Sequence, residues 1–144
     1  MSAYLVDSHC HLDRLELSKY DGSLQGVIDT ATQNNVRRML CVSIDLEAYP
    51  AMLEQVRPYP QISVSVGVHP NERDGEEPTV ERLVELAQDN KVIAIGETGL
   101  DYFRSEGDLE WQRERFRVHI EASKQTAKPL IIHTRDARQD TLDL

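Results

Sequence analysis

At residues 7–13 the chain reads Asp-Ser-His-Cys-His-Leu-Asp, which places His9 and His11 two residues apart after a short apolar run. If residues 4–9 form a strand, side chains two apart leave the same face, separated by roughly 6.6–6.8 Å along the strand. Metal–nitrogen bonds of about 2.0–2.1 Å then let both imidazoles bind one ion. Cys10 points to the opposite face and is expected to pack under helices. The segment therefore predicts a strand that ends in a metal-binding pair.

Downstream of this segment, the hydrophobic pattern alternates between strand and helix. Apolar runs predict further strands at residues 38–43, 62–69, 92–97 and 129–133. Helical spacing of apolar residues predicts helices at 24–31, 49–56, 80–87 and 108–126, and another helix opens at 136. Strands that alternate with helices pair in parallel through right-handed crossovers, so the fold class is α/β.

The candidate functional residues all follow the C-terminal ends of predicted strands: His11, His69, Glu97 and His133. Active sites of (β/α)8 barrels lie at that end. A doubly wound open sheet also binds ligands there, but its nucleotide-binding forms have a glycine-rich first turn. Here that turn contains the two histidines, so we predict a TIM-barrel type of fold. We expect residues 1–144 to form a single domain with about the first five strands and four helices of the barrel.

Glu97 and His133 are candidate partners of the histidine pair. Glu97 lies between Gly96 and Gly99, which allow close backbone approach. Its carboxylate can bridge two cations at the ~3.5–4 Å spacing of two-metal hydrolases, and the alternative is a buried glutamate paired with an arginine. His133 is either a metal ligand or a core histidine with satisfied hydrogen bonds.

Three other residues leave alternatives open. His69 either hydrogen-bonds a substrate phosphate or supports a ligand, and Asp101 either accepts a hydrogen bond from a ligand imidazole or caps a loop. Arg135 either clamps a phosphate oxygen or pairs with Asp136. His119 is expected to pack within its helix. The arginines around the same helix are expected either to form a solvated face balanced by Glu106, Glu110 and Glu114 or to guide a nucleic-acid strand. They are Arg104, Arg113, Arg115 and Arg117.

Composition limits the class of protein. A net charge of −9 over 144 residues argues against a general nucleic-acid coat protein, but not against an enzyme that takes one phosphodiester into a metal pocket. No apolar run is long enough to span a membrane, and no secretory signal is visible. The two cysteines are expected to be reduced thiols. We therefore expect a cytoplasmic protein without a membrane partner.

Four motifs together resemble the TatD-type metal-dependent deoxyribonuclease family, within the amidohydrolase-like barrels. They are Asp7–Asp13, Gly67–Pro70, Gly96–Tyr102 and Ile132–Ala137, in the family order and over essentially the whole chain. The resemblance implies that the metal ligands are His9, His11, Glu97 and His133, with Glu97 bridging. It also implies that His69 and Arg135 lie near the scissile phosphate.

The resemblance implies a deoxyribonuclease or other phosphodiesterase that uses a metal-activated water, with Glu97 as the catalytic residue and DNA or another phosphodiester as substrate. Two divalent ions are expected, of Zn, Mn, Ni, Fe or Mg. The alternatives are an amidohydrolase acting on C–N or ester bonds and a non-catalytic truncated half-barrel. The family pattern continues with a sixth-strand histidine and an eighth-strand aspartate. We therefore expect the chain to be the N-terminal part of a longer barrel, whose other strands come from the rest of the chain or from self-association.

Overall fold

The computed structural model describes residues 3–144, in which strands and helices alternate along the chain. The strands are β1 (Leu5–Cys10), β2 (Val36–Cys41), β3 (Ile62–Val66), β4 (Val92–Asp101) and β5 (Leu130–Arg135). The helices are α1 (Leu24–Gln33), α2 (Tyr49–Val56), α3 (Val80–Leu86), α4 (Glu110–Thr126) and α5 (Arg138–Asp143). Two short 3-10 helices, Leu12–Arg14 and Leu17–Tyr20, precede α1 and were not predicted. Every strand and α-helix predicted from hydrophobic periodicity is confirmed.

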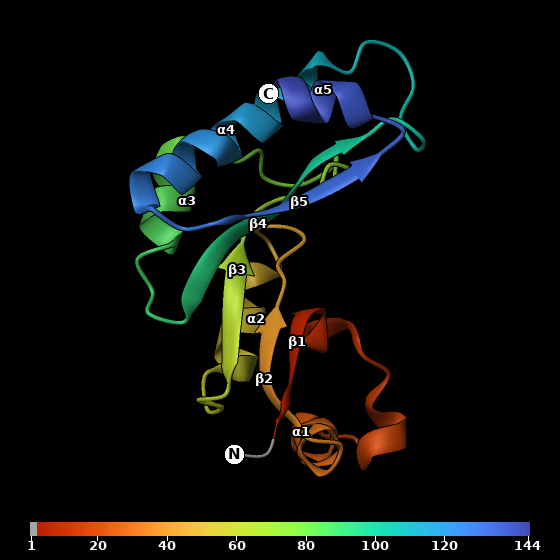
Figure 1. Ribbon diagram of the computed structural model, residues 1–144, viewed down its shortest axis with the longest axis vertical. Helices are drawn as coiled ribbons and strands as arrows, with labels where there is room; N and C mark the ends of the chain where they lie inside the picture. Colours follow the sequence, from red (N-terminus) through yellow and green to blue (C-terminus); the bar gives the residue numbers. More distant parts are fainter. Residues whose placement is uncertain (1–2) are drawn as a thin grey trace.

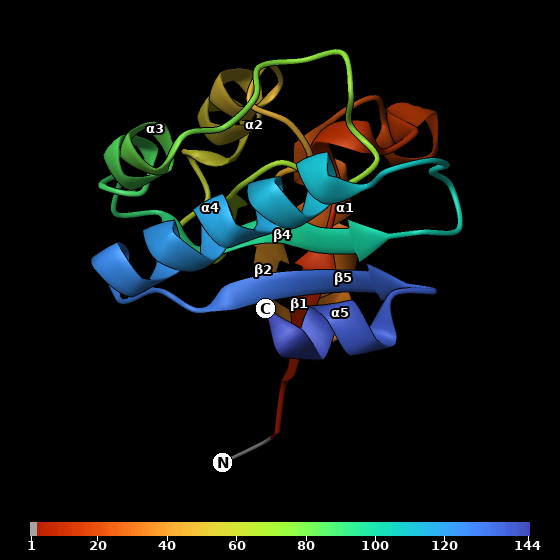
Figure 2. The same ribbon diagram turned by 90° about the horizontal axis from the view of Figure 1, so that it is seen from above.

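The strands form one parallel sheet in the order β1-β2-β3-β4-β5. Each strand pairs with the next one along the chain, so the order has no reversal of the kind that defines a doubly wound sheet. In Figure 1, β4 and β5 run at a steep angle to β1 and β2, which shows how strongly the sheet curls. Figure 2 shows α2, α3 and α4 together on one side of the strands. The chain is thus an α/β curled half-barrel, as predicted, with β1 and β5 at its edges.

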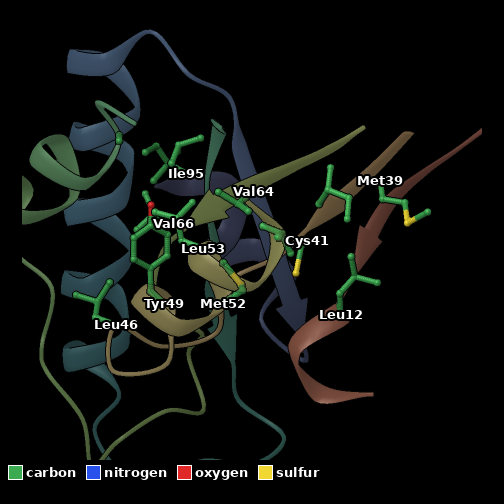
Figure 3. Close-up of a cluster of buried hydrophobic side chains, with 14 of the residues drawn as sticks. Leu12, Met39, Cys41, Leu46, Tyr49, Met52, Leu53, Val64, Val66 and Ile95 are labelled. Atoms are coloured by element: carbon green, nitrogen blue, oxygen red, sulfur yellow. The ribbon is translucent and has the colours of Figure 1, made fainter. Parts of the chain in front are cut away.

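The main hydrophobic core lies between the sheet and its covering helices (Figure 3). Met39 and Cys41 enter it from β2 and Val64 from β3, because alternate residues of a strand share one face. Met52 and Leu53 of α2 pack against them from the helix side. Since this core fixes β2, β3 and β4 against their helices, it also fixes the loops that follow these strands.

The largest differences from the predicted strand ends are in β3 and β4. β3 ends at Val66 rather than at 69, so His69 lies in the following loop. β4 continues past Glu97 to Asp101, because its second half pairs with β5 through contacts such as Gly99 opposite His133. As a result, His69 lies in a loop and Asp101 lies on a strand at the carboxyl end of the sheet.

Two irregularities of strand register coincide with candidate ligands. Between Asp7 and Cys10, β1 has one residue more than the paired segment of β2, and His9 falls within this stretch. Between Ile95 and Thr98, β4 has one residue more than β5, and Glu97 falls there. An extra residue of this kind turns a side chain away from the regular alternation of the strand.

The cysteines are free thiols in the structure, as predicted. Cys10 packs half-buried against the core, and its Sγ–H donates to the Leu40 carbonyl. Burial raises the pKa of Cys10 to about 12 and that of Cys41 to about 11. Both side chains therefore stay protonated at neutral pH. Within residues 3–144, no helix combines the length and hydrophobicity needed to cross a membrane.

Candidate metal centre

Glu97 is the centre of the site, and its side chain is 12% exposed. His9 Nε2 lies 3.2 Å from Oε2, while His133 Nδ1 and His69 Nε2 lie 3.5 and 3.9 Å from Oε1. Among residues 3–144, no arginine or lysine lies within ion-pair distance of this carboxylate. The alternative of a buried glutamate paired with an arginine is therefore excluded.

Two glycines beside Glu97 let β4 approach β5 closely. Gly96 and Gly99 have φ values of +140° and +131°, which L side chains rarely adopt. A Cβ on Gly96 would lie 2.7 Å from the Ile131 carbonyl oxygen, and one on Gly99 would lie 2.0 Å from that of His133. The close approach predicted from these glycines is thus present, and it brings Glu97 beside His133.

The first group of possible ligand atoms comes from His9, His11 and Glu97, whose atoms lie within 4.8 Å of one another. The imidazoles meet edge to face, with ring centroids 5.2 Å apart. His11 Nδ1–H donates to the Val42 carbonyl at 2.9 Å, so the lone pair of this ring is on Nε2. A backbone carbonyl that fixes the tautomer in this way is typical of metal-binding histidines.

The second group comes from His69, Glu97 and His133, which also lie within 4.8 Å of one another. His133 Nε2–H donates to the Asp101 carboxylate at 2.9 Å, which leaves the Nδ1 lone pair facing Glu97 Oε1. A carboxylate behind an imidazole orients the ring and makes it a stronger ligand. The Nδ1 atom of His133 is therefore available as a ligand atom.

The hydrogen bonds of His69 give it a different role within the same group. The backbone N–H of Asn71 donates to His69 Nδ1 at 3.1 Å, so the neutral ring carries its proton on Nε2. Burial lowers the pKa of His69 to about 4, despite the carboxylates nearby, and the ring is neutral at physiological pH. Nε2–H then lies 3.3 Å from His133 Nδ1 at the centre of the site. His69 presents a hydrogen-bond donor there, which suits a substrate oxygen better than a cation.

Asp101 combines both of the roles between which the sequence left a choice. Its carboxylate accepts from His133, and it also closes a turn by accepting the backbone N–H of Arg104 at 3.1 Å. Asn71 Nδ2 donates to it at 2.9 Å. Burial works to raise the pKa of Asp101, but the hydrogen bonds from Asn71, Arg104 and His133 outweigh burial and lower the pKa below its ordinary value. The group is an anion at neutral pH and supports His133 from behind.

Side chains on the inner face of α4 hydrogen-bond the backbone of β4 and of the loop after β3, on both sides of the site. Gln112 bonds both backbone polar groups of Asp101, and His119 Nε2 accepts the N–H of Val68 at 3.0 Å. Arg115 Nη1 donates to the His69 carbonyl at 3.0 Å, and its guanidinium pairs with Glu77. The prediction that Arg115 belongs to a solvated face is wrong, because its side chain is only 4% exposed. For Arg113 and Arg117, which pair with Glu110, the prediction is confirmed.

The role of α4 was not predicted, although the sequence carries a signal for it. Gln112, Phe116 and His119 have helical spacing, and all three are buried. Polar side chains on a buried helical stripe need hydrogen-bond partners, so they indicate contacts with backbone beneath the helix. Which backbone they contact depends on tertiary structure, as does the contribution of Asn71.

Arg135 forms no ion pair with Glu97 in the described part of the chain. It ends β5, two residues beyond His133, and its guanidinium carbon is 3.7 Å from the centroid of the Phe103 ring. Its predicted alternative, an ion pair with Asp136, is absent. In the described chain, no carboxylate lies within ion-pair distance of this guanidinium.

The ligand atoms fit a centre with two divalent ions. Neutral imidazole and carboxylate groups suit Zn, Mn, Ni and Fe, and carboxylate oxygen also suits Mg. Glu97 belongs to both groups and offers one carboxylate oxygen to each, which is the arrangement of a bridging ligand. The structure thus brings together all four residues predicted as ligands: His9, His11, Glu97 and His133.

Comparison with known proteins identifies related sequences over nearly the whole chain. The profile of a family described as TatD related DNase matches residues 6–144. An uncharacterized metal-dependent hydrolase of Escherichia coli K12, YcfH, is 41% identical over 140 residues, which are 96% of this chain and 52% of the relative. The 3'-5' ssDNA/RNA exonuclease TatD of Salmonella typhimurium is 28% identical over 131 residues, 90% of this chain and 50% of the relative. The chain spans about half the length of the curated relatives it matches.

The comparison of structures agrees with the half-barrel. The crystal structure of YJJV, a TatD homolog from Escherichia coli K12, has a TM-score of 0.82 with this chain at 24% identity. The match covers 94% of this chain and 52% of that one. At such an identity the likeness shows the fold alone.

Proposed function

Because the chain belongs to the TatD-related DNase family, we propose that its site serves the metal-dependent hydrolysis of phosphodiester bonds in DNA. The observation that carries this proposal is the position of Glu97, which belongs to both groups of possible ligand atoms. A carboxylate at this position suits a hydrolase with two metal ions, because its charge offsets the repulsion between two closely spaced dications.

In this proposal, His9 and His11 would hold one ion, His133 would hold the other, and Glu97 would serve as a ligand for both. Bound divalent ions would activate a water molecule and neutralise negative charge on the phosphate. Asp101 keeps the His133 ring in the tautomer whose Nδ1 lone pair faces Glu97 and would be available to an ion. Val42 does the same for His11 through its carbonyl oxygen.

Two further residues act on the substrate. His69 donates its Nε2–H to a non-bridging oxygen of the phosphate, since its Nδ1 is already occupied by the Asn71 N–H. Arg135 contributes a guanidinium that has no carboxylate to neutralise it, and such a group binds a phosphate oxygen well.

The same ligands would also serve an amidohydrolase, in which the ions polarise a carbonyl group. Arg135 favours the phosphodiesterase, because a neutral amide or ester offers little to an uncompensated cation, whereas a nucleic acid carries a negative charge at every phosphate. The third possibility, a non-catalytic half-barrel, would bind ions without turnover.

The test is hydrolysis of single-stranded DNA labelled at its 5' end, with Mg²⁺, Mn²⁺ or Zn²⁺. It uses the 144-residue chain and a fusion in which this chain replaces the matching half of YcfH. We expect the fusion to shorten the DNA and its His11→Ala variant to lose this activity. Hydrolysis of amides or carboxylic esters without cleavage of DNA would support the amidohydrolase instead. Binding of ions without turnover of any of these substrates would support the non-catalytic role.

A further inference from the structure

The contact between Arg135 and Phe103 joins the ends of two neighbouring strands. Phe103 follows β4 and is 60% exposed, which is unusual because phenylalanine is among the residues that are most often buried. The guanidinium of Arg135 stacks on the ring at 3.7 Å from its centroid. This arrangement leaves a planar cation and an aromatic surface together at the carboxyl end of the sheet. Figure 1 shows the loop after β4 and the end of β5 meeting at that end.

Backbone hydrogen bonds hold this pair in place on both sides of Phe103. The N–H of Tyr102 donates to the carbonyl of Arg135 at 2.9 Å. The N–H of Arg104 donates to the Asp101 carboxylate at 3.1 Å, which closes a turn around Phe103. An aromatic residue whose backbone is already held in place loses less conformational entropy on binding a ligand than one on an unanchored loop.

The pair lies one short step from the metal centre. Asp101 is opposite Arg135 in the sheet register and accepts a hydrogen bond from His133. Arg135 is two residues beyond His133, which is an advance of about 6.6 Å along a parallel strand. A nucleotide whose phosphate lies at Glu97 and His133 can therefore reach Phe103 with its own base or with that of its neighbour.

The acidic residues in the loops after β2 and β3 also favour a DNA strand that lies on the side of β4 and β5. The loops after β2 and β3 enclose a cavity of about 210 Å³ that carboxylates dominate, with Arg115 as its basic residue. The acidic lining residues are Asp45, Glu47, Glu72, Asp74 and Glu76. Phosphates are repelled there, which disfavours a path of the strand over these loops and is consistent with one toward β4 and β5.

From these observations we propose that Phe103 and Arg135 form a platform on which a base of single-stranded DNA stacks. The inference rests on the proposed function and names a binding subsite for the substrate of the same centre. Stacking on an aromatic ring selects unpaired bases, because a base in a duplex already stacks on its neighbours. Arg135 adds a flat cationic surface and binds the adjoining phosphate.

The chain allows a direct test with an internal control, because it contains only two phenylalanines. Phe103 is exposed, and Phe116 is buried in the core. Labelling with 4-fluorophenylalanine gives one ¹⁹F resonance for each, and the Phe103→Leu variant assigns them. The ligands are a tetrathymidylate with phosphorothioate linkages, which resist hydrolysis, and an abasic tetramer with the same linkages.

We expect the tetrathymidylate to shift the Phe103 resonance and to leave that of Phe116 unmoved. It should bind at least about fivefold more tightly than the abasic tetramer, as one stacked base implies. Phe103→Leu should remove this difference, and Phe103→Tyr should retain it. Arg138→Gln, which removes the same charge three residues away, should weaken both ligands slightly and leave their ratio unchanged.

Equal affinity for the two tetramers, no binding of the tetrathymidylate, or an unmoved Phe103 resonance would overturn the platform. Hydrolysis of DNA by the fusion protein is measured independently. Persisting hydrolysis with equal affinities would therefore reject the platform alone. Preference for the tetrathymidylate without hydrolysis would support the platform and reject the nuclease activity.

Discussion

Gln112 holds Asp101 by both of its backbone polar groups. The Gln112 Oε1 atom accepts the Asp101 N–H at 2.9 Å, and Nε2 donates to the Asp101 carbonyl at 3.1 Å. The side-chain amide thus pairs with β4 in the way that a further strand would. Because Asp101 orients His133, a residue of α4 determines the position of a candidate metal ligand.

We predict that Gln112→Met lowers divalent-ion affinity more than its effect on folding explains. The substitution keeps the volume of the side chain but leaves two buried backbone groups of Asp101 without partners. Loss of support behind a ligand typically costs about 10–100-fold in metal affinity. Isothermal titration with Mn²⁺ or Zn²⁺ measures the affinity, and ¹⁵N spectra of the imidazoles report whether His133 keeps its proton on Nε2.

Phe116→Leu is the matched control for this prediction. It lies on the same buried face of α4 but has no hydrogen bond to the site, and it should cost about 1 kcal/mol of stability. If both variants reduced metal affinity equally, the effect of Gln112 would be one of helix packing alone.

Because His119 is buried, the free energy of unfolding should be lower in weak acid than at neutral pH. Burial lowers its pKa from 6.5 to about 4. Between these values the unfolded chain binds a proton that the folded chain does not, so the free energy of unfolding falls as the pH decreases. The full loss is on the order of 3 kcal/mol, of which about 2 kcal/mol appears between pH 7 and 5.

Urea unfolding at pH 7, 6 and 5 measures this dependence in the parent and in His119→Gln. Glutamine keeps an acceptor for the Val68 N–H but does not titrate. Burial also lowers the pKa of His69, which contributes in the same range, so the variant should lose part of the slope and keep the rest. An unchanged slope in His119→Gln would contradict the prediction.

Arg115 and its partner Glu77 should differ strongly in their effect on stability. Arg115→Met removes charged donors from the carbonyls of His69 and Glu72, and it should cost about 2–3 kcal/mol in unfolding free energy. Glu77→Gln should cost less than about 1 kcal/mol, because the Glu77 side chain is 60% exposed. Similar losses in denaturant unfolding would show that the ion pair, rather than the contact with the loop, is what matters.

The features that could be predicted from the sequence are those that depend on residues close together along the chain. The alternation of strands and helices follows from periodicity, which is local, and the order of strands follows from short parallel crossovers. The grouping of His9, His11, Glu97 and His133 follows as well, because strand ends of a parallel sheet meet at one edge. Arg115 was misplaced because its neighbours in sequence, Glu110 and Glu114, offered sufficient partners for an exposed arginine.

What could not be read from the sequence depends on atoms that are distant along the chain. The extra residues of β1 and β4 are visible only in the register with neighbouring strands. The tautomer of His69 depends on a hydrogen bond within its own loop, which tertiary contacts from Arg115 hold in shape. The stack of Arg135 on Phe103 joins residues 32 positions apart, and neither residue has a pattern that predicts the other.

Glu97 should be needed for both ions, whereas His11 should be needed for one. A neutral amide in Glu97→Gln cannot offset the repulsion between two dications about 4 Å apart, so we expect the stoichiometry to fall from two ions to one or none. His11→Ala should leave the ion that His133 and Glu97 share, with a stoichiometry near one. Equilibrium dialysis with metal analysis gives these values, and circular dichroism checks that the variants remain folded. Because Glu97 supplies one oxygen to each group, Glu97→Gln should also lower the total amount of bound metal more than His133→Ala does. Two ions retained by folded Glu97→Gln would show that the carboxylate does not bridge them, and the centre would then have to be assigned to the imidazoles alone.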